Sequence, residues 1–362
     1  MRILHVTDVY LPRLGGIEMQ VHDLADHQRR RGHDVTVLTT TADDGAAEDP
    51  ATVRLPGSRP RVLRRLLAEA APDVVHCHSS GFSPLAWITA RQALVAGLPV
   101  VATMHSVVPA LGPVADLIRQ VVRQVGPGMS WTSVSTVGAD SLTRLVPTPV
   151  GVSPNGVDAS GWTTADPGVA DVPTIVAVMR LTTRKRPVPL LAILAAVRDL
   201  APDTPFRAVI AGAGPRQAAA EHALVKYGLT DQVQLAGRLS RPQVAQLLAG
   251  ADLFLAPAYL ESFGIAALEA RCAGLPVIAM RGGGVQEFIR DGEDGFLVGD
   301  DTQMAARTAE LLTDRTLLRG MAQQIRTTPT NLGWEETVDR AVADYVAAGA
   351  VDRRALLTAV RS

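Results

Sequence analysis

Short apolar runs rich in β-branched residues alternate with longer segments of helical periodicity along the whole chain. The runs have the length of buried strands, and the segments between them repeat their apolar positions every three to four residues. The predicted strands are Arg2–Val6, Asp34–Thr39, Val74–His78, Val100–Met104, Thr174–Met179, Arg207–Ala211, Asp252–Ala256 and Val277–Met280. Strands that alternate with helices predict βαβ units, and therefore an α/β protein with parallel sheets.

A partial internal repeat divides the chain into two similar halves. The segment Ala96–Ala102 (AGLPVVA) recurs as Ala273–Ala279 (AGLPVIA), and in both copies Gly ends a helix before Pro opens a strand. We therefore expect two tandem Rossmann-like domains, with parallel sheets that face each other across a cleft. A connector rich in Pro, Gly and Asp places the boundary near residue 168. The predicted parts are an N-terminal domain over 1–168, a second domain over 169–332 and a helical tail over 333–362.

Composition restricts the class of protein. The chain has 362 residues, 47% hydrophobic and 20% charged, which suits a globular protein of two domains. A formal net charge of -1 gives no overall attraction to nucleic acid. Cys77 and Cys272 lie in separate halves, which leaves no disulfide framework and no four-thiolate zinc site. The chain opens on a strand without a leader, and no stretch reaches about 18 uninterrupted apolar residues, so we expect a cytoplasmic protein.

The strongest chemical signal is the segment Glu261–Glu269 (ESFGIAALE), which follows a predicted strand and runs into a helix. Glu261 is placed to accept hydrogen bonds from vicinal sugar hydroxyls, and Glu269 to hold a ribose. Between them, a helix N-terminus offers free backbone N–H groups, where a diphosphate binds. These groups belong to Ser262, Phe263, Gly264 and Ile265. The alternative is ordinary: a charge near a helix N-terminus and a solvated helix residue.

A cluster of cations follows the strand Thr174–Met179. Arg180 comes directly after the strand, and Arg184, Lys185 and Arg186 lie in the same loop. Ligands of open α/β sheets bind at the carboxyl ends of strands, where fixed cations stabilise the charge of a departing nucleoside diphosphate. The chain contains no Asp-x-Asp pair, so Arg180 and Lys185 are predicted to take the place of a metal ion. A plain solvated loop has the same composition.

Glycine-rich turns follow several predicted strands. Gly15 and Gly16 precede a helix, which places their amides to face a phosphate or a donor sugar, and Gly212 lies in a second such turn. Neither turn gives the full Gly-x-Gly-x-x-Gly dinucleotide fingerprint with its ribose-binding acid. A tight turn without a ligand is the ordinary alternative.

Histidines lie at two of the predicted strand ends. His105 follows the strand Val100–Met104, where its imidazole suits a bond to a sugar hydroxyl or a role at a transfer centre, and a structural role fits equally. The run His76-Cys77-His78 has metal-ligating residue types. Alternation along a buried strand, however, turns Cys77 away from both histidines, so we expect no metal site.

Together these motifs resemble the family 4 glycosyltransferases, which have the two-Rossmann B-type fold (GT-B) and generally use nucleotide-sugar donors with retention of configuration. The resemblance covers nearly the whole chain. It is carried by the Glu-x7-Glu segment together with Arg180, Lys185 and the turn Gly284–Glu287. Further matching segments are 10–18, 31–35, 73–78, 153–158 and 292–298.

The resemblance implies a role for each candidate residue. By this resemblance, Arg180 and Lys185 bind the donor pyrophosphate, and Glu261 binds the donor sugar. Glu269 binds the ribose, and Gly16 and His105 lie at the transfer centre. Family members often carry Gly at the positions of Met179 and Arg186, so this loop departs from the family pattern. The segment from Gly333 resembles the family's last helix, which crosses back to the first domain.

The expected activity is transfer of a hexosyl group from a nucleotide-diphosphate sugar to an acceptor hydroxyl, without a metal or any other cofactor. GDP-mannose is expected before UDP-sugars as the donor, and the acceptor is a lipid-linked or soluble glycan or small molecule. A nucleotide-sugar 2-epimerase shares this fold and stays an alternative. The chain lacks the dinucleotide fingerprint of an NAD-dependent oxidoreductase, which argues against that activity. A glycosidase needs two carboxylates on opposite sides of a cleft, whereas Glu261 and Glu269 lie on one segment.

Arginines interleave with leucines before and within a predicted helix over 61–70. The leucines share one face and the arginines flank it, which suits shallow insertion at an anionic membrane surface. The same pattern suits a crossover helix packed on the sheet. The residues that would give a peripheral contact with the inner membrane face are Arg59, Arg61, Arg64 and Arg65.

Overall fold

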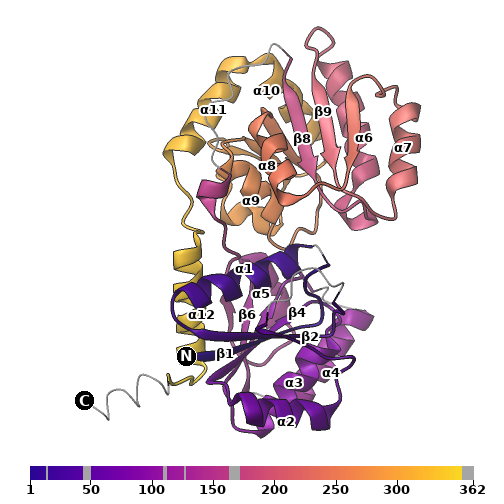
Figure 1. Cartoon of the computed structure of the whole chain (residues 1–362). Helices are drawn as coiled ribbons and strands as arrows, with labels where there is room; N and C mark the ends of the chain where they lie inside the picture. The colour runs from indigo at the N-terminus through magenta and orange to yellow at the C-terminus, as the bar shows by residue number, and fades with distance from the viewer. Residues whose placement is uncertain (14, 44–49, 109–111, 126–127, 163–171, 353–362) are drawn as a thin grey trace. The chain divides into compact units, whose positions relative to one another are not determined.

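The structure is a computed structural model that describes residues 1–13, 15–43, 50–108, 112–125, 128–162 and 172–352 (Figure 1). The chain forms two compact units. The first comprises Met1–Gly156 together with the segment from Leu332 onward, and the second is Val157–Asn331. The boundary expected near residue 168 lies outside the described residues, and the division between the units falls earlier, after Gly156.

The first unit is built on a parallel sheet with the strand order β3-β2-β1-β4-β5-β6-β7. The strands are β1 (Arg2–Thr7), β2 (Asp34–Thr39), β3 (Thr52–Arg54), β4 (Val74–Ser79), β5 (Val100–Met104), β6 (Ser130–Ser133) and β7 (Val150–Val152). The order reverses between β1 and β4, where His5 lies beside His76. In doubly wound sheets, ligands bind at the carboxyl ends of the strands at such a reversal.

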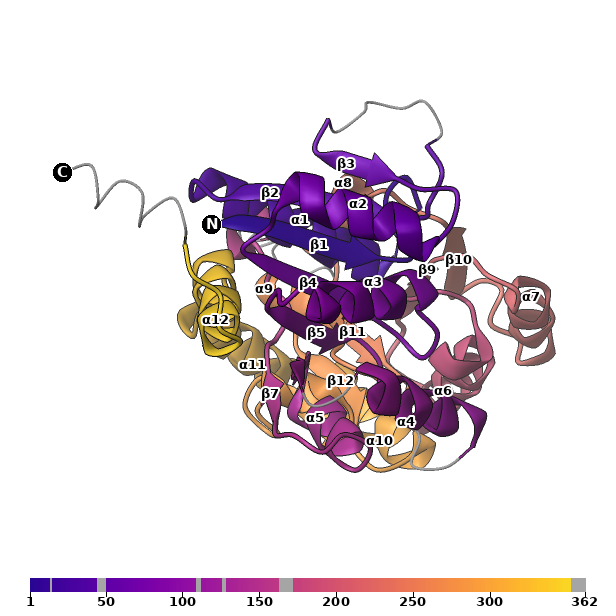
Figure 2. The ribbon, with the colours of Figure 1, turned by 90° about the horizontal axis from the view of Figure 1, so that it is seen from below.

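Helices cover both faces of this sheet. They are α1 (Gly16–Arg30), α2 (Pro60–Ala70), α3 (Pro84–Val95), α4 (Pro113–Val125), α5 (Thr136–Thr143) and α12 (Trp334–Ala347). Successive strand residues point to opposite faces. Ile3 therefore packs in the cluster that holds α1 and Tyr345 of α12, whereas Leu4 packs in the cluster that holds α2, α3 and α4. Figure 2 shows α2 and α3 in front of β1 and β4.

Helix α2 is an ordinary crossover helix with a cationic outer face. Leu63 and Leu67 are 0% and 3% exposed and lie in the core on the sheet. The four arginines of this region are exposed: Arg59, Arg61, Arg64 and Arg65. The leucines are therefore not available for insertion into a membrane, and that part of the membrane hypothesis is wrong.

The second unit repeats the same topology. Its parallel sheet has the order β10-β9-β8-β11-β12-β13, with the reversal between β8 and β11. The strands are β8 (Thr174–Val178), β9 (Arg207–Ala211), β10 (Val233–Gly237), β11 (Leu253–Ala256), β12 (Val277–Met280) and β13 (Gly295–Val298). The helices are α6 (Pro187–Leu200), α7 (Gln217–Lys226), α8 (Arg241–Ala249), α9 (Ile265–Cys272), α10 (Asp301–Thr313) and α11 (Arg315–Thr327), and the short 3₁₀ turns are η2 (Ala159–Gly161), η3 (Thr183–Lys185) and η4 (Gly284–Glu287).

The predicted α/β fold with two parallel sheets is confirmed. The structure contains each of the predicted strands, with ends that agree to within one residue. It adds short strands that the apolar pattern did not indicate, and one of them, β3, lies in a segment that is rich in Ala, Asp, Gly and Pro. These additions extend both sheets but leave the order reversals unchanged.

Candidate functional site

The carboxyl end of β8 carries the predicted cations. Arg180 is exposed, and its side chain makes no hydrogen bond or ion pair within the described parts of the chain. Lys185 ends the η3 turn, and its Nζ donates a hydrogen bond to Oε2 of Glu261, which follows β11. These two side chains are 28% and 15% exposed. The predicted cation and the predicted carboxylate therefore lie side by side at the order reversal of the second sheet.

Arg186, the next cation in the loop, has a structural role. Its guanidinium donates two parallel hydrogen bonds to Asp301 at 2.8 and 2.7 Å and a third to the carbonyl oxygen of Pro257 at 2.9 Å. It also lies over the Tyr259 ring, 4.2 Å from the centroid. The hydrogen bonds to Asp301 raise the pKa of Arg186. Through these contacts Arg186 holds the loop in place.

The loop that bears Glu261 is held by a glycine turn. The N–H of Gly284 donates to the carbonyl oxygen of Glu261 at 2.8 Å. A Cβ at Gly284 would lie 2.3 Å from the carbonyl oxygen of Ser262, so no other residue fits there without moving the loop. The match of the turn Gly284–Glu287 to the family pattern thus has a physical basis, because this turn sets the path of the Glu261 loop.

The predicted donor-binding segment after Glu261 is largely buried. Ser262 and Phe263 are 5% and 2% exposed, and the Phe263 ring packs 5.5 Å from that of Phe288. Gly264 is the N-cap residue of α9, and Ile265 is its first residue. The side chains of Ser262 and Phe263 thus belong to the core, which leaves the backbone for a ligand. Glu269 lies on α9 and is half-buried.

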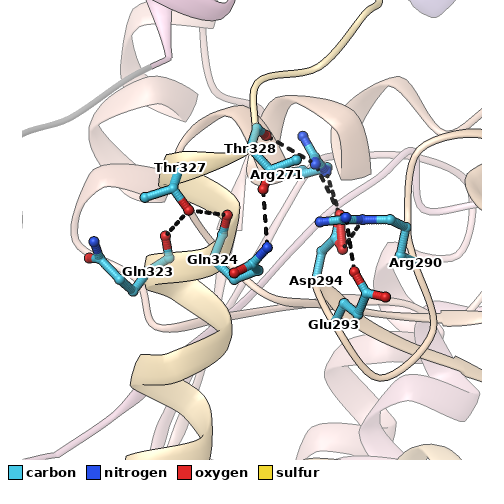
Figure 3. Close-up of polar contacts among 8 residues, drawn as sticks. All are labelled: Arg271, Arg290, Glu293, Asp294, Gln323, Gln324, Thr327 and Thr328. Carbon is cyan, nitrogen blue, oxygen red and sulfur yellow. Dashed lines mark hydrogen bonds and ion pairs between the residues drawn. The ribbon is translucent and has the colours of Figure 1, made fainter.

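A buried ion pair anchors α9 (Figure 3). Arg271 is 5% exposed, and its Nη2 and Nε lie 2.9 and 3.1 Å from Oδ2 of Asp294, which is fully buried. Arg290 approaches the same carboxylate from the other side, with Nε 3.0 Å from Oδ1. Arg271 also donates to the carbonyl oxygen of Thr328 after α11. Asp294 lies in a segment that matches the family pattern, and its contact with Arg271 ties that segment to α9.

The turn that contains Gly212 packs against the Arg180 loop. A Cβ at Gly212, whose φ is +135°, would lie 1.8 Å from the carbonyl oxygen of Met179. Leu181 donates its N–H to the carbonyl oxygen of Ala213 at 3.0 Å. Glycine is therefore required at position 212 by the neighbouring protein backbone. This contact places the turn directly beside Arg180.

Gly15 and Gly16 lie where the sequence predicts them, at the start of α1 in the first unit. Gly15 is the N-cap residue in an extended conformation, and Gly16 is the first helical residue. Glu18 reaches back to this turn, because a Cβ at Gly15 would lie 2.4 Å from its Oε2. The Glu18 carboxylate is buried and pairs with Arg13 at 3.1 Å. An acid that sequence reasoning did not single out thus already lies at this helix N-terminus.

His105 follows β5 in the first unit and joins a group of buried histidines. Its Nε2 lies 3.0 Å from Nδ1 of His78. Burial lowers the pKa of His105 and of His5 to about 4, and holds the pKa of His76 and His78 well below the ordinary value. These four imidazoles are therefore neutral at pH 7.

The prediction that Cys77 faces away from the neighbouring histidines is confirmed, because its Sγ donates to the carbonyl oxygen of Ala86 on the opposite face. The structure instead brings His5 to His76 and His78, with ring nitrogens within 4.8 Å of one another. Each of these six nitrogens already has a hydrogen-bond partner. A metal ion would have to replace those bonds.

Comparison with known proteins assigns the fold to a family. The family model described as Glycosyltransferase Family 4 matches residues 14–160. A second model, described as Glycosyl transferases group 1, matches residues 166–328. A GDP-mannose-dependent alpha-(1-6)-phosphatidylinositol monomannoside mannosyltransferase of Mycobacterium tuberculosis is 29% identical over 387 residues, which cover 95% of this chain and 98% of that protein. A subunit of the phosphatidylinositol N-acetylglucosaminyltransferase of Arabidopsis thaliana is 28% identical over 316 residues, 80% of this chain and 70% of the relative.

A solved structure has the same architecture. Anabaena Alr3699/HepE in complex with UDP superposes with a TM-score of 0.81 at 19% identity, covering 96% of this chain and all of the other. Fold and matched segments together define a glycosyltransferase of the GT-B class. The chain belongs to the family 4 glycosyltransferases. Among the described residues, no helix is both long enough and apolar enough to cross a membrane.

Proposed function

We propose that this glycosyltransferase moves a hexosyl group from a nucleotide-diphosphate sugar to an acceptor hydroxyl with retention of configuration and without a metal ion. The observation that carries the proposal is the contact between Lys185 and Glu261, with the exposed Arg180 in the same loop. A cation for the departing diphosphate and a carboxylate for sugar hydroxyls thus occupy the place where doubly wound sheets bind ligands.

In this proposal Arg180 and Lys185 stabilise the charge that develops on the leaving nucleoside diphosphate. Glu261 holds Lys185 in position and accepts hydrogen bonds from the donor sugar, while Glu269 binds the ribose. Backbone groups around Gly212 and at Gly264 and Ile265 complete the donor site. Gly15 contributes to donor binding, and Gly16 and His105 act at the transfer centre.

Metal independence follows if the two cations do the work of a divalent ion. Turnover of a nucleotide sugar by the purified protein should survive EDTA, and added magnesium or manganese should change it by less than about twofold. Loss of activity in EDTA with recovery on adding either ion would contradict this part of the proposal. The anomeric configuration of the product, read by NMR at early times, tests retention and also separates transfer from 2-epimerisation.

The donor is proposed to be GDP-mannose before UDP-sugars. The relative of M. tuberculosis named above is described as GDP-mannose-dependent, whereas the Anabaena structure contains UDP, so both nucleotides have a precedent. Thermal-shift measurements with GDP, UDP and their sugars would decide between them, because a ligand that binds only the folded chain raises its melting temperature. Equal shifts with all nucleotides, or none, would leave the preference for GDP without support.

The proposed acceptor is lipid-linked, since the M. tuberculosis and A. thaliana relatives both carry phosphatidylinositol in their names. Any membrane contact of α2 would be electrostatic, through Arg59, Arg61, Arg64 and Arg65, because Leu63 and Leu67 lie in the core and Leu66 packs against it. Sedimentation with anionic vesicles should then require low salt and weaken when Arg61, Arg64 and Arg65 become Gln. Failure to sediment at low salt would favour a soluble acceptor.

A further inference from the structure

A continuous chain of hydrogen bonds runs through the first unit from α12 to His105. Tyr345 of α12 receives a hydrogen bond from Nε2 of Gln28 at 2.9 Å. The Oε1 of Gln28 lies 2.7 Å from Nε2 of His5, and Nδ1 of His5 lies 2.8 Å from Nε2 of His78. The chain ends where Nδ1 of His78 meets Nε2 of His105 at 3.0 Å.

Neutral imidazoles in such a chain cannot choose their tautomers independently. Each ring carries one hydrogen, so a nitrogen that donates leaves the other nitrogen of that ring as an acceptor. Because Oε1 of Gln28 can only accept, His5 carries its hydrogen on Nε2 and accepts at Nδ1. His78 must then donate from Nε2 and accept at Nδ1, and His105 must donate from Nε2.

We infer that Gln28, His5 and His78 are positioning residues that hold His105 in the Nε2–H tautomer, with Nδ1 as a hydrogen-bond acceptor for a sugar hydroxyl. This inference rests on the proposed role of His105 at the transfer centre. Nδ1 of His105 has no hydrogen-bond partner within the described residues, and the residue is only half-buried. A ligand can therefore reach the end of the chain at this atom.

The other members of the chain are not themselves placed to bind a sugar. His5, Gln28 and His78 are 0%, 0% and 3% exposed. The cavity beside them, lined in part by His76, His78, Thr103 and His105, has a volume of about 30 Å³. That volume accommodates about one water molecule and is far below that of a sugar-binding pocket. The buried residues therefore act through His105.

Tyr345 links the Gln28 amide to a further buried histidine. Its hydroxyl accepts from Gln28 and lies 2.8 Å from Nδ1 of His76, to which it donates. The second nitrogen of His76 lies 2.7 Å from the hydroxyl of Thr103. A reversed Gln28 amide would reverse every bond and turn His105 into an Nδ1–H donor. The orientation of the Gln28 amide, which bonds to Tyr345 on α12, thus determines whether Nδ1 of His105 accepts or donates.

Ring-nitrogen NMR of ¹⁵N-labelled protein at neutral pH reads this tautomer directly, and the spectrum of His105→Gln identifies the His105 signals. We expect a protonated Nε2 and an unprotonated Nδ1. In Gln28→Met and in the milder Tyr345→Phe, we expect both tautomers of His105 and a fall in kcat of roughly tenfold, with KM for the donor nearly unchanged. Gln20→Met is the matched control, because Gln20 is also buried on α1 and, within the described parts of the chain, its side chain bonds to the backbone of Gly156 alone.

The outcomes separate this inference from the proposed function. An Nδ1–H tautomer in the wild type, or an unchanged tautomer in both Gln28→Met and Tyr345→Phe, would overturn the inference whatever the activity. The same changes in Gln20→Met would show a general loosening of the unit and would also overturn it. Wild-type turnover in His105→Ala would instead remove His105 from the proposed reaction, even where the spectra show the expected tautomer.

Discussion

The two units have the same strand order and opposite chemistry at the order reversal. In the second unit, charged and partly exposed side chains gather there: Arg180, Lys185 and Glu261. In the first unit the corresponding strands carry buried, neutral imidazoles that bond to one another. The elements nearby are also held differently, by the Arg271–Asp294 ion pair in one unit and by uncharged hydrogen bonds to Tyr345 in the other.

Under the proposed function, the difference separates what each half of one fold has to stabilise. A departing diphosphate gains negative charge, so its site needs cations that remain ionised near water. Sugar hydroxyls are neutral, so a site for them needs hydrogen-bonding groups with defined donors and acceptors and no net charge. The same sheet topology supplies either environment, because the side chains at the strand ends are independent of strand order.

The largest effect is expected from breaking the ionic anchor of the second unit. Asp294→Ala leaves two arginines without their shared carboxylate, one of them buried, and should destabilise the unit by about 3–5 kcal/mol. Calorimetry should show a clear fall in the melting temperature. Glu293→Ala is the control, because Glu293 is 57% exposed and pairs only at the surface, so its loss should cost less than about 1 kcal/mol. Similar melting temperatures for the two variants would contradict an anchoring role for Asp294.

The next effect concerns the charged site itself. Lys185→Ala and Arg180→Ala should each lower turnover ~100-fold or more, since each cation would stabilise the developing charge by a few kcal/mol. The melting temperature should change little in Arg180→Ala, whose side chain is exposed, and only modestly in Lys185→Ala, which removes the partner of Glu261. Arg184→Ala offers a matched control from the same exposed loop. Full turnover in the first two variants would remove these cations from the mechanism.

A smaller effect is expected when acid breaks the neutral histidine chain. Burial lowers the pKa of His5 from 6.5 to about 4, and repulsion from Arg29 acts in the same direction, against the hydrogen bond to Gln28. Between these two pH values the unfolded chain binds a proton that the folded chain excludes. The stability contributed by neutral His5 is therefore complete above about pH 6.5 and is lost as the pH falls toward 4, by about 1.4 kcal/mol per pH unit.

Melting curves between pH 7 and pH 5 measure this slope. His5→Gln should reduce it by the share of one imidazole, whereas His222→Gln, at an exposed position on α7, should leave it unchanged. An equal slope in the wild type and in His5→Gln would show that other groups dominate the acid sensitivity.

The sequence predicts features that depend on local pattern and on topology. The strands, and the opposite orientations of Cys77 and the neighbouring histidines, follow from periodicity and are confirmed. The proximity of Lys185 and Glu261 follows from parallel strands whose carboxyl ends meet at one edge. The roles of these residues in the reaction stay predictions.

The features that sequence reasoning missed join residues far apart in the chain. His5, Gln28 and Tyr345 come from three separate elements, and nothing near any of them indicates the others. Arg186 looked like one more cation of the loop, because its partner Asp301 lies 115 residues away. Buried polar contacts of this kind are set by how elements pack, which no local pattern encodes.

The position of Tyr345 near the end of the chain also has a consequence for synthesis. The ribosome completes the whole second unit, Val157–Asn331, before α12 is made. Until then Gln28 and His76 lack the hydroxyl that both of them bond, and the apolar cluster between the sheet and α1 lacks the side chains of α12. The first unit thus begins to fold early and acquires its final polar core last, so the order in which the units are completed is the reverse of the order in which they begin.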